Sequence, residues 1–379
     1  MAKIKKRSIA TIILLSFALM LMTASCGIIS DTLTAEASGP SAASQGAPPS
    51  LPSGSPTPRQ SNTDGGLLTV IFLDVGQADA TLLQSDDMTM LIDGGNSSDS
   101  DLIYTVLRER GITHLDYVVA THAHADHVGG LSGALNYATV GVALSPVTEY
   151  DTRAFGSFAS NLDRLGVQIT IPSPGDTFML GSAEVAILGP STIDENDPND
   201  TSIILMVTHG SVSFLFTGDA ERNAEQRILD EGWDLSATVF HVGHHGSNTS
   251  TIYPFLREVM PDYAIISCGA GNSYGHPHEP VLSRLRDADV TVFRTDMQGD
   301  ITAVSDGANV TFTTNRNADI QTNPTEQQND EAHYIGNRNS LKFHRPTCGG
   351  LPAEHNRVMF SSLEDAYSQG FDPCGTCRP

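Results

Sequence analysis

Residues 121–127 read Thr121-His122-Ala123-His124-Ala125-Asp126-His127 and place four metal-binding side chains within six consecutive positions. They directly follow the apolar run 115–120, which has the length and composition of a buried β-strand. Four ligands from one short loop cannot all bind one tetrahedral ion, but they can bind two neighbouring ions. We therefore expect His122 and His124 on one ion and Asp126 and His127 on a second.

Three later segments also carry possible metal ligands directly after apolar runs. They are Asp219 after 212–216, His241, His244 and His245 after 237–240, and His276 and His278 after 263–266. With the first segment, these clusters hold eight of the 13 histidines, whereas histidines that only fill a core would be scattered. Two cations roughly 3.5–4 Å apart can activate a water and hold both sides of a displacement at phosphorus or carbonyl carbon. The sequence thus predicts a dinuclear hydrolytic centre in which Asp219 is suited to bridge the ions.

The charge of the chain limits its partners. The 379 residues include 21 Lys and Arg against 44 Asp and Glu, a formal charge of −23, and residues 66–315 hold only ten basic side chains, all Arg. Such a surface repels polyanions unless metal ions or local Arg clusters offset it, which excludes a general basic clamp for nucleic acid. Hydrophobic content of 39% excludes wholesale disorder, and five cysteines exclude a disulfide-stapled miniprotein.

The first 26 residues are typical of an export signal. A basic stretch at 3–7 precedes an apolar run at 9–22, and the small residues 23–25 lead to Cys26. This pattern resembles a bacterial lipoprotein signal whose cysteine, Cys26, is lipidated, although Thr23 stands where such signals usually carry Leu. An ordinary cleaved signal and an uncleaved anchor remain alternatives. All three predict an extracytoplasmic protein, secreted or anchored to the membrane through a lipid at Cys26.

Between two polar stretches, short apolar runs alternate with helical patterns. Residues 27–65 are rich in Ser, Gly and Pro and predict a flexible linker, and 315–332 predict a second linker. We expect strands at 67–73, 89–92, 115–120, 203–207, 212–216, 237–240 and 263–266, and helices at 101–110, 129–137, 153–165, 220–231, 252–260 and 280–288. This mixture predicts packed sheets with helices outside them.

The motifs together resemble the metallo-β-lactamase fold, in which H-x-H-x-D-H is followed by Thr-Gly-Asp, here Thr217-Gly218-Asp219. Segments 74–80, 91–94, 242–247 and 274–278 narrow the resemblance to the hydrolase domain of the ComEC competence proteins. It covers about residues 66–314. It implies an α/β (α+β) fold, an αββα sandwich of two sheets.

The resemblance also implies roles for individual residues. The metal ligands would be His122, His124, Asp126, His127 and Asp219, with one of His244 and His245 completing the second ion. Asp126 and Asp219 would also act in catalysis, and His278 could contact a phosphate oxygen or protonate the leaving group. Asp93 would orient a ligand histidine. We expect Asp74 to support the ligands in the same way, and Asp79 to face the site as a further catalytic carboxylate. The alternative is that Asp74 and Asp79 only cap turns. We expect two divalent ions, zinc or manganese, since a site without thiolate suits either, and also iron.

The chain departs from the pattern at three points. Many members of the fold carry a ligand histidine before the Thr-Gly-Asp, where this chain has Asn199-Asp200-Thr201-Ser202. We interpret His209 as a residue of a hairpin tip rather than a ligand. One ion is then short of a protein ligand, unless His278 supplies it. Ala78 replaces a usual Gly, and Cys268 is interpreted as a small buried residue.

The C-terminal residues 333–379 form a separate motif. His344 and Cys348 give H-x3-C, and Cys374 and Cys377 give C-x2-C, a set that suits a closed tetrahedral zinc site. A disulfide is the alternative, but it would leave one of these three cysteines unpaired. The segment resembles the zinc-binding domain of the Ada DNA-repair protein. His344 replaces the first cysteine of the four-cysteine version, so the methyl-accepting chemistry is not implied.

We expect an exported dinuclear metallohydrolase that cleaves phosphodiester bonds, with DNA as its substrate and no protein partner. The first alternative is an esterase for small phosphodiesters, such as phosphocholine on a cell-wall polymer. The second is an extracellular DNA-binding protein whose hydrolase domain is an inactive scaffold.

Overall fold

The computed structural model describes residues 66–193, 197–323, 334–346, 348–360 and 363–377. The signal at 1–26 with Cys26 and the linker at 27–65 lie outside the described residues. Within these ranges, none of the helices is both long and apolar enough to pass through a lipid bilayer.

Two large β-sheets form the body of residues 66–323. The first has the strand order β15-β14-β1-β2-β3-β4-β5-β6, and the second has the order β13-β12-β11-β10-β9-β8-β7. The strands of the first sheet are β1 (Leu68–Phe72), β2 (Thr81–Ser85), β3 (Met88–Ile92), β4 (His114–Val119), β5 (Thr139–Leu144), β6 (Ile169–Thr170), β14 (Ile301–Ser305) and β15 (Val310–Thr314). Those of the second are β7 (Thr177–Leu180), β8 (Ala183–Gly189), β9 (Ile204–His209), β10 (Val212–Phe216), β11 (Val239–His241), β12 (Tyr263–Ile266) and β13 (Thr291–Arg294).

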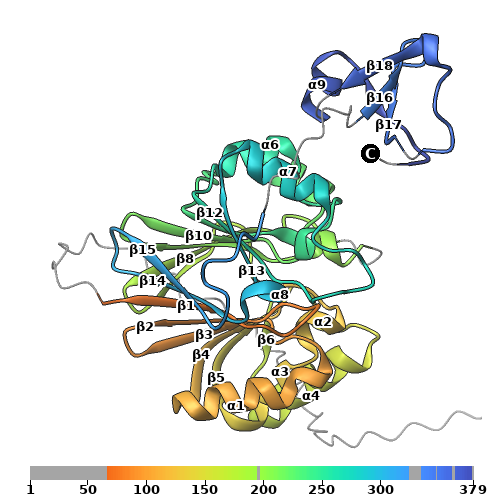
Figure 1. Cartoon of the computed structure of the whole chain (residues 1–379). Helices are drawn as coiled ribbons and strands as arrows, with labels where there is room; N and C mark the ends of the chain where they lie inside the picture. The colour runs from red at the N-terminus through yellow and green to blue at the C-terminus, as the bar shows by residue number, and fades with distance from the viewer. Residues whose placement is uncertain (1–65, 194–196, 324–333, 347, 361–362, 378–379) are drawn as a thin grey trace, which may run out of the picture. The chain divides into compact units, whose positions relative to one another are not determined.

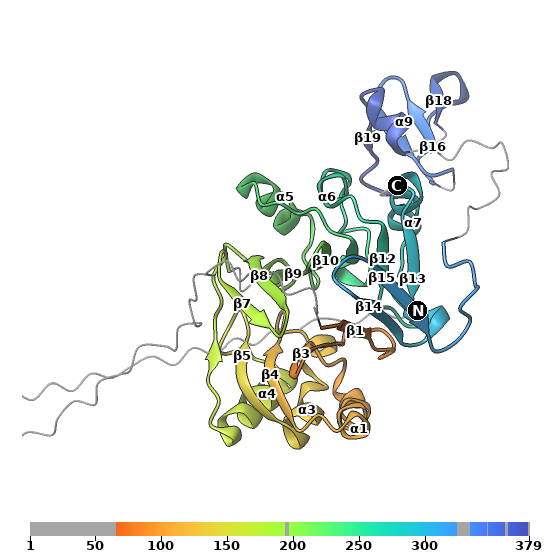
Figure 2. The same ribbon diagram turned by 90° about the vertical axis from the view of Figure 1, so that its left-hand side faces the viewer.

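Helices cover the outer face of each sheet (Figures 1 and 2). They are α1 (Ser100–Arg110), α3 (Leu131–Tyr137), α4 (Arg153–Leu165), α5 (Arg222–Glu231), α6 (Tyr253–Val259) and α7 (Glu279–Asp287). Two short helices, α2 (Ala125–Val128) and α8 (Thr295–Gln298), lie in the segments that follow β4 and β13. One apolar cluster joins α1, α3 and α4 to the first sheet, a second fills the space between the sheets, and a third joins α5, α6 and α7 to the second sheet. The αββα sandwich implied by the sequence is confirmed.

Parallel strands bring the predicted motifs to one edge. In the first sheet β4 is parallel to β3 and β5. In the second sheet β10, β11, β12 and β13 run parallel, with Phe216 opposite His241 and His241 opposite Ile265. Since the carboxyl ends of parallel strands lie at the same edge, the loops after β10, β11 and β12 start side by side.

The described part of the predicted second linker is bonded to this body. Arg316 Nη2 lies 2.9 Å from Asp74 Oδ2, and Asn323 Nδ2 donates to the Leu282 carbonyl at 3.0 Å. Thr322 is buried. Residues 315–323 therefore extend along the two-sheet body.

The C-terminal module has its own sheet, in the order β18-β16-β17-β19. Its elements are β16 (Tyr334–Asn337), β17 (Lys342–His344), β18 (Arg357–Phe360), α9 (Leu363–Ser368) and β19 (Asp372–Pro373). The buried residues of its core are Phe343, Phe360, Ala366 and Phe371. A core of this size leaves a small domain marginally stable, which is the situation in which a structural metal contributes most.

Close packing of α3 against α1 yields a stability prediction. A Cβ on Gly133 of α3 would lie 1.9 Å from the Ser100 carbonyl oxygen, so the two helices must separate to admit it. We expect Gly133→Ala to lower the free energy of unfolding by about 1–3 kcal/mol in urea titrations. The matched control is Gly156→Ala in α4, where a Cβ meets no atom within 4 Å. It should raise that free energy by about 0.5–1 kcal/mol. Equal stability of the two variants would contradict the packing argument.

Candidate metal centre

Backbone contacts fix the first histidine segment against the loop after β3. The Gly94 N–H donates to the His127 carbonyl at 2.7 Å, and the Gly130 N–H donates to the Gly95 carbonyl at 3.0 Å. A Cβ at Gly130 would lie 1.9 Å from the Gly94 carbonyl oxygen, so only glycine permits this approach. The segment is thereby held in a defined conformation where β4 ends and α2 begins.

Asp219 lies at the centre of a group of imidazoles. Its Oδ1 is 3.3 Å from His127 Nε2, and its Oδ2 is 3.9 Å from His122 Nε2. The Nε2 atoms of His244 and His245 lie 3.6 and 3.7 Å from the same Oδ2. Two segments that are distant in the sequence, 122–127 and 244–245, thus direct ring nitrogens at one buried carboxylate.

His122 and His124 have different neighbours from Asp126 and His127 around Asp219. His122 Nε2 lies 3.0 Å from His124 Nδ1, which pairs these two rings. Asp126 Oδ2 lies 3.5 Å from His245 Nε2, so Asp126, His127 and His245 form a second group. Asp219 contacts rings of both groups, His122 of the first and His127 and His245 of the second.

Several buried polar atoms at this centre lack a hydrogen-bond partner in the described structure. They are Asp79 Oδ1, His127 Nε2, Asp219 Oδ1 and His245 Nε2. The same four residues offer ligand atoms that all lie within 4.8 Å of one another. A buried polar group without a partner costs about 1–3 kcal/mol, so this convergence fits a bound cation.

The electrostatics of the centre favour positive charge. Burial alone would raise the pKa of the Asp219 carboxyl, but His127 and His245 outweigh it and hold that pKa well below its usual value. Burial alone would lower the pKa of His127, but Asp219 and Asp93 raise it well above its usual value. A divalent ion bound here would take the place of the protons that these carboxylates otherwise stabilise on the rings.

Asp93 supports the first segment from behind. Its Oδ2 lies 2.8 Å from His127 Nδ1, and its two oxygens accept hydrogen bonds from the N–H and the hydroxyl of Thr121. This contact directs Nε2 of His127 toward Asp219. Such a carboxylate fixes the tautomer and orientation of a ligand histidine.

Asp79 lies beneath His245, together with His241, the first of the three possible ligands that follow residues 237–240. Asp79 Oδ1 is 3.5 Å from His245 Nδ1 and 3.6 Å from His241 Nε2. His245 Nδ1 is also 3.1 Å from the Ser267 carbonyl. Asp79 therefore lies against both rings, and His241, at the end of β11, contacts Asp79.

Other predicted residues have contacts elsewhere. Asp74 caps the Gly76 N–H at 3.4 Å and pairs with Arg316, the turn-capping arrangement that we left open. The ring nitrogens of His209 contact the hydroxyls of Ser305 and Ser182 at 2.9 and 3.4 Å. Cys268 is buried in the apolar cluster beneath α6 and α7.

The loop before α7 closes one side of the centre. His276 is stacked on His245 with ring centroids 6.3 Å apart, and its Nδ1 lies 3.2 Å from Gln77 Nε2. His278 Nδ1 accepts the Asn248 N–H at 3.0 Å. His278 is thus held beside the segment that carries His244 and His245.

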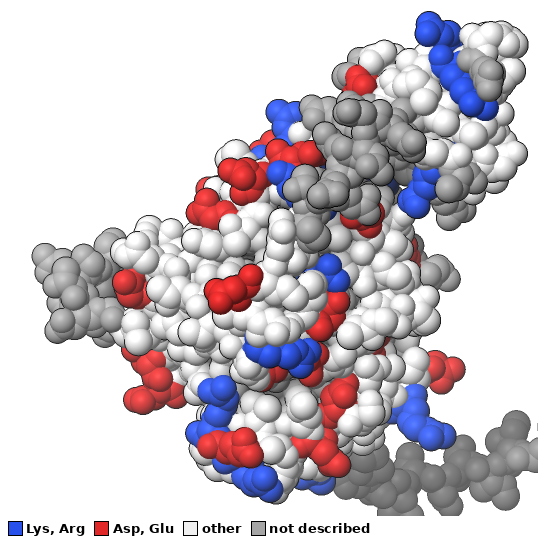
Figure 3. Space-filling model, viewed as in Figure 1, with Lys and Arg blue, Asp and Glu red and all other residues white. Residues whose placement is uncertain are grey.

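A groove of about 960 Å³ opens beside the centre. Ala123, between the first two histidines, lines it, as does Tyr150, whose ring centroid is 6.4 Å from that of His124. The charged side chains that line the groove are Glu149, Asp151 and Asp163, all acidic. On the face seen in Figure 3, acidic side chains are spread over the hydrolase body with basic ones among them.

The C-terminal module holds a second group of possible metal ligands. His344, Cys348, Cys374 and Cys377 offer ligand atoms that all lie within 4.8 Å of one another. Hydrogen bonds from the backbone N–H groups of Cys377 and Thr376 lower the pKa of the Cys374 thiol to about 7, which favours the thiolate that zinc binds. One imidazole and three thiolates fit a structural zinc site.

Comparisons with known proteins agree with both parts of the chain. The model of the metallo-beta-lactamase superfamily matches residues 73–270, and that of the metal binding domain of Ada matches residues 320–379. The chain is 30% identical over 250 residues to ComE operon protein 3 of Bacillus subtilis, covering 61% of this chain and 32% of that protein. Identity is 29% over 232 residues to Competence protein ComA of Neisseria gonorrhoeae, with coverages of 61% and 31%. It is 33% over 234 residues to Recombination protein 2 of Haemophilus influenzae, with coverages of 60% and 28%. The chain spans less than a third of the length of each of these relatives.

Asp93 contacts a possible ligand histidine and Asp74 does not, so replacing each should affect metal affinity differently. Asp93→Ala removes the acceptor behind His127, so we expect metal affinity to fall about 10–100-fold in competition with a chelator. Asp74→Ala breaks only a surface pair and a turn cap, and should leave that affinity unchanged. If both variants bound metal as the wild type does, the orienting role of Asp93 would be wrong.

The His344, Cys348, Cys374 and Cys377 cluster predicts a zinc ion that can be removed without affecting the metal centre at Asp219. Cys374→Ser should remove one equivalent of zinc, measured by mass spectrometry of the dialysed protein, and unfold the module, since a structural ion contributes folding free energy directly. The metal content of the hydrolase body should not change. Full zinc retention in Cys374→Ser would show that this cluster is not a zinc site.

Proposed function

We propose that this chain, which belongs to the metallo-beta-lactamase superfamily, is a dinuclear metal-dependent phosphodiesterase that cleaves DNA. It also carries an Ada-type metal-binding domain at residues 320–379. The observation that carries this proposal is the convergence of ring nitrogens and carboxylates on the buried Asp219. Two divalent ions, zinc or manganese, would supply an activated water and offset the charge of the phosphate when bound there.

In this proposal, different residues hold the two ions. Asp126, His127 and His245 hold one ion, and His122 and His124 hold the other. Asp219 lies between the two groups and is placed to contact both ions. Asp79, beneath His245, adds negative charge that favours cation binding. The backbone contacts of the glycine-rich loops keep these groups in place, so little reorganisation is needed when the substrate binds.

We assign His278 a role toward the substrate phosphate. Its Nδ1 accepts the Asn248 N–H, so the proton of the neutral ring is on Nε2. Nε2 can therefore donate a hydrogen bond to a phosphate oxygen or a proton to the leaving oxygen.

DNA is the substrate favoured by the relatives, whose names refer to competence and recombination. The acidic body opposes a long polyanion, and the ions supply the local positive charge that a single scissile phosphate needs. Arg338, Lys342 and Arg357 are partly or fully exposed on the C-terminal module and could bind the strand away from the centre.

The groove favours a second candidate, an esterase for small phosphodiesters. Its charged lining residues are all acidic, so it suits an uncharged or cationic group attached to the phosphate better than a second phosphate. Phosphocholine on a cell-wall polymer is one such substrate.

We further propose that the protein acts outside the cytoplasm, attached to the membrane by a lipid on Cys26. This proposal rests on the basic and apolar pattern of residues 3–22 and on the small residues before Cys26. Metabolic labelling with a fatty acid should mark the wild type and not Cys26→Ser.

The test of the activity compares substrates and variants in the presence of manganese or zinc. We expect cleavage of single-stranded DNA and of bis-para-nitrophenyl phosphate by the wild type. His127→Ala and Asp126→Ala should each lose on the order of 10²–10³-fold in rate, because an ion in such a site is worth several kcal/mol at the transition state. Wild-type rates from both variants would show that the site is wrongly assigned.

The same experiment separates the alternatives. Cleavage of the small ester without cleavage of DNA would favour the esterase. Binding of DNA without any cleavage, abolished by Cys374→Ser, would favour a DNA-binding protein with an inactive hydrolase scaffold.

A further inference from the structure

In the dinuclear centre proposed above, one ion is short of a protein ligand. Asp126, His127, His245 and Asp219 would hold one ion, whereas His122 and His124 would have only Asp219 beside them for the other. No histidine occurs between residues 128 and 208, and both ring nitrogens of His209 contact serine hydroxyls. The missing ligand must therefore come from another segment.

His244 is placed to supply it. Its Nε2 lies 3.6 Å from Asp219 Oδ2, the oxygen that also faces His122 Nε2 at 3.9 Å. His244 and His245 both adopt left-handed backbone conformations, with φ of 52° and 54°. Such a conformation is unfavourable for a residue other than glycine and is concentrated at functional sites. It lets two adjacent rings approach the same carboxylate, with their planes 65° apart.

Glu221 holds the other nitrogen of His244. Its Oε1 lies 3.1 Å from His244 Nδ1, and Thr249 Oγ1 is 3.2 Å from the same nitrogen. A carboxylate at Nδ1 keeps the proton there, so the lone pair of Nε2 faces Asp219. Glu221 follows Asp219 by two residues and could have been noticed from that spacing.

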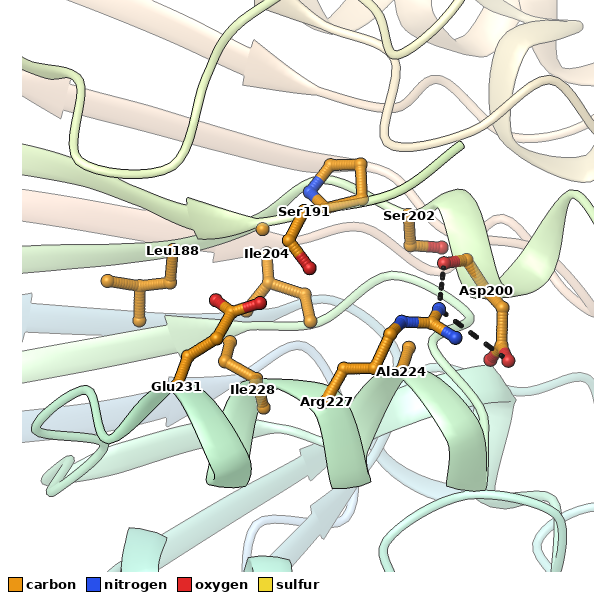
Figure 4. A pocket seen from close by; sticks show the side chains of 11 residues that line it. Leu188, Ser191, Asp200, Ser202, Ile204, Ala224, Arg227, Ile228 and Glu231 are labelled. Carbon is orange, nitrogen blue, oxygen red and sulfur yellow. Dashed lines mark hydrogen bonds and ion pairs between the residues drawn. The ribbon is translucent and has the colours of Figure 1, made fainter. Parts of the chain in front are cut away.

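Residues 199–202, which stand where many members of the fold carry a ligand histidine, form hydrogen bonds with Glu221 and Asp219. Asn199 Nδ2 donates to Glu221 Oε1 at 3.1 Å, and Asp200 Oδ1 accepts the Glu221 N–H at 3.0 Å. Ser202 Oγ accepts the Asp219 N–H at 3.1 Å. Asp200 is held in turn by Arg227 of α5, whose Nη2 donates to the Asp200 carbonyl at 2.9 Å (Figure 4).

We propose that His244 Nε2 is the third histidine ligand of the ion bound by His122 and His124, and that Glu221, held by Asn199 and Asp200, is the residue that positions it. The segment 199–202 thus acts through hydrogen bonds, where other members of the fold use a ligand histidine. This inference rests on the dinuclear centre proposed above.

The test measures metal content and affinity in the full chain. Wild type, His244→Ala, Glu221→Gln and Glu221→Ala are dialysed against manganese at a series of chelator concentrations, and bound metal is measured by mass spectrometry. His244→Ala should lose one equivalent of manganese from the hydrolase body and keep the other. Glu221→Ala should weaken the same equivalent about 10–100-fold, and Glu221→Gln should weaken it less, because an amide oxygen can still accept from Nδ1.

The control is His114→Ala, an exposed histidine at the other end of β4, which should bind manganese as the wild type does. Unchanged binding of both ions by His244→Ala would overturn the inference, as would loss of both ions together in a variant with wild-type melting temperature. Equal weakening in Glu221→Gln and Glu221→Ala would overturn the positioning role. A wild type that binds fewer than two manganese ions in the hydrolase body would instead refute the dinuclear centre itself.

Discussion

The buried carboxylate of Asp219 is the constraint on which the centre depends. A carboxylate removed from water is stable only if positive charge or several donors surround it. Here four imidazoles from two segments face it, at distances of 3.3 to 3.9 Å. Those rings are themselves buried or partly buried and need acceptors, which Asp93 and Glu221 provide. The centre is thus a network in which each group stabilises the charge of the next.

The same electrostatics account for how an acidic protein could process an acidic substrate. Exposed charges act over about 8–10 Å at physiological ionic strength, whereas buried charges are screened much less. Two cations bound at Asp219 would therefore offset the charge of a scissile phosphate. The acidic lining of the adjacent groove, including Asp151 and Asp163, would select the group attached to that phosphate. Affinity for a long strand would then have to come from another surface, such as the C-terminal module.

The sandwich was predictable because its central strands are apolar runs and its motifs follow them. Several other strands were not predicted: β2, β5, β6, β7, β8, β13, β14 and β15. Two of them, β15 and β7, lie at the edges of the sheets. β15, with the sequence VTFTT, alternates between partly buried and exposed side chains, and β7 exposes every second residue. Such edge strands bury only one face, so no continuous apolar run marks them. Each pairs with the strand next to it in the sequence, β15 with β14 and β7 with β8, whereas β14 pairs in turn with β1, which is distant in the sequence.

The residues available for metal binding were readable from the chain alone, because the chemistry of an imidazole or a carboxylate belongs to the residue itself. The sequence also determined that these residues follow strands, since apolar runs precede them. Only the tertiary structure decided which of them meet. Asp93 reaches His127 and Asp74 pairs with Arg316, although both follow strands in the same sheet. Likewise, the directions of the His244 and His245 rings depend on two left-handed backbone conformations and, for His244, on Glu221. Distances of 3–4 Å between segments a hundred residues apart are set by strand register and loop conformation, which no local pattern encodes.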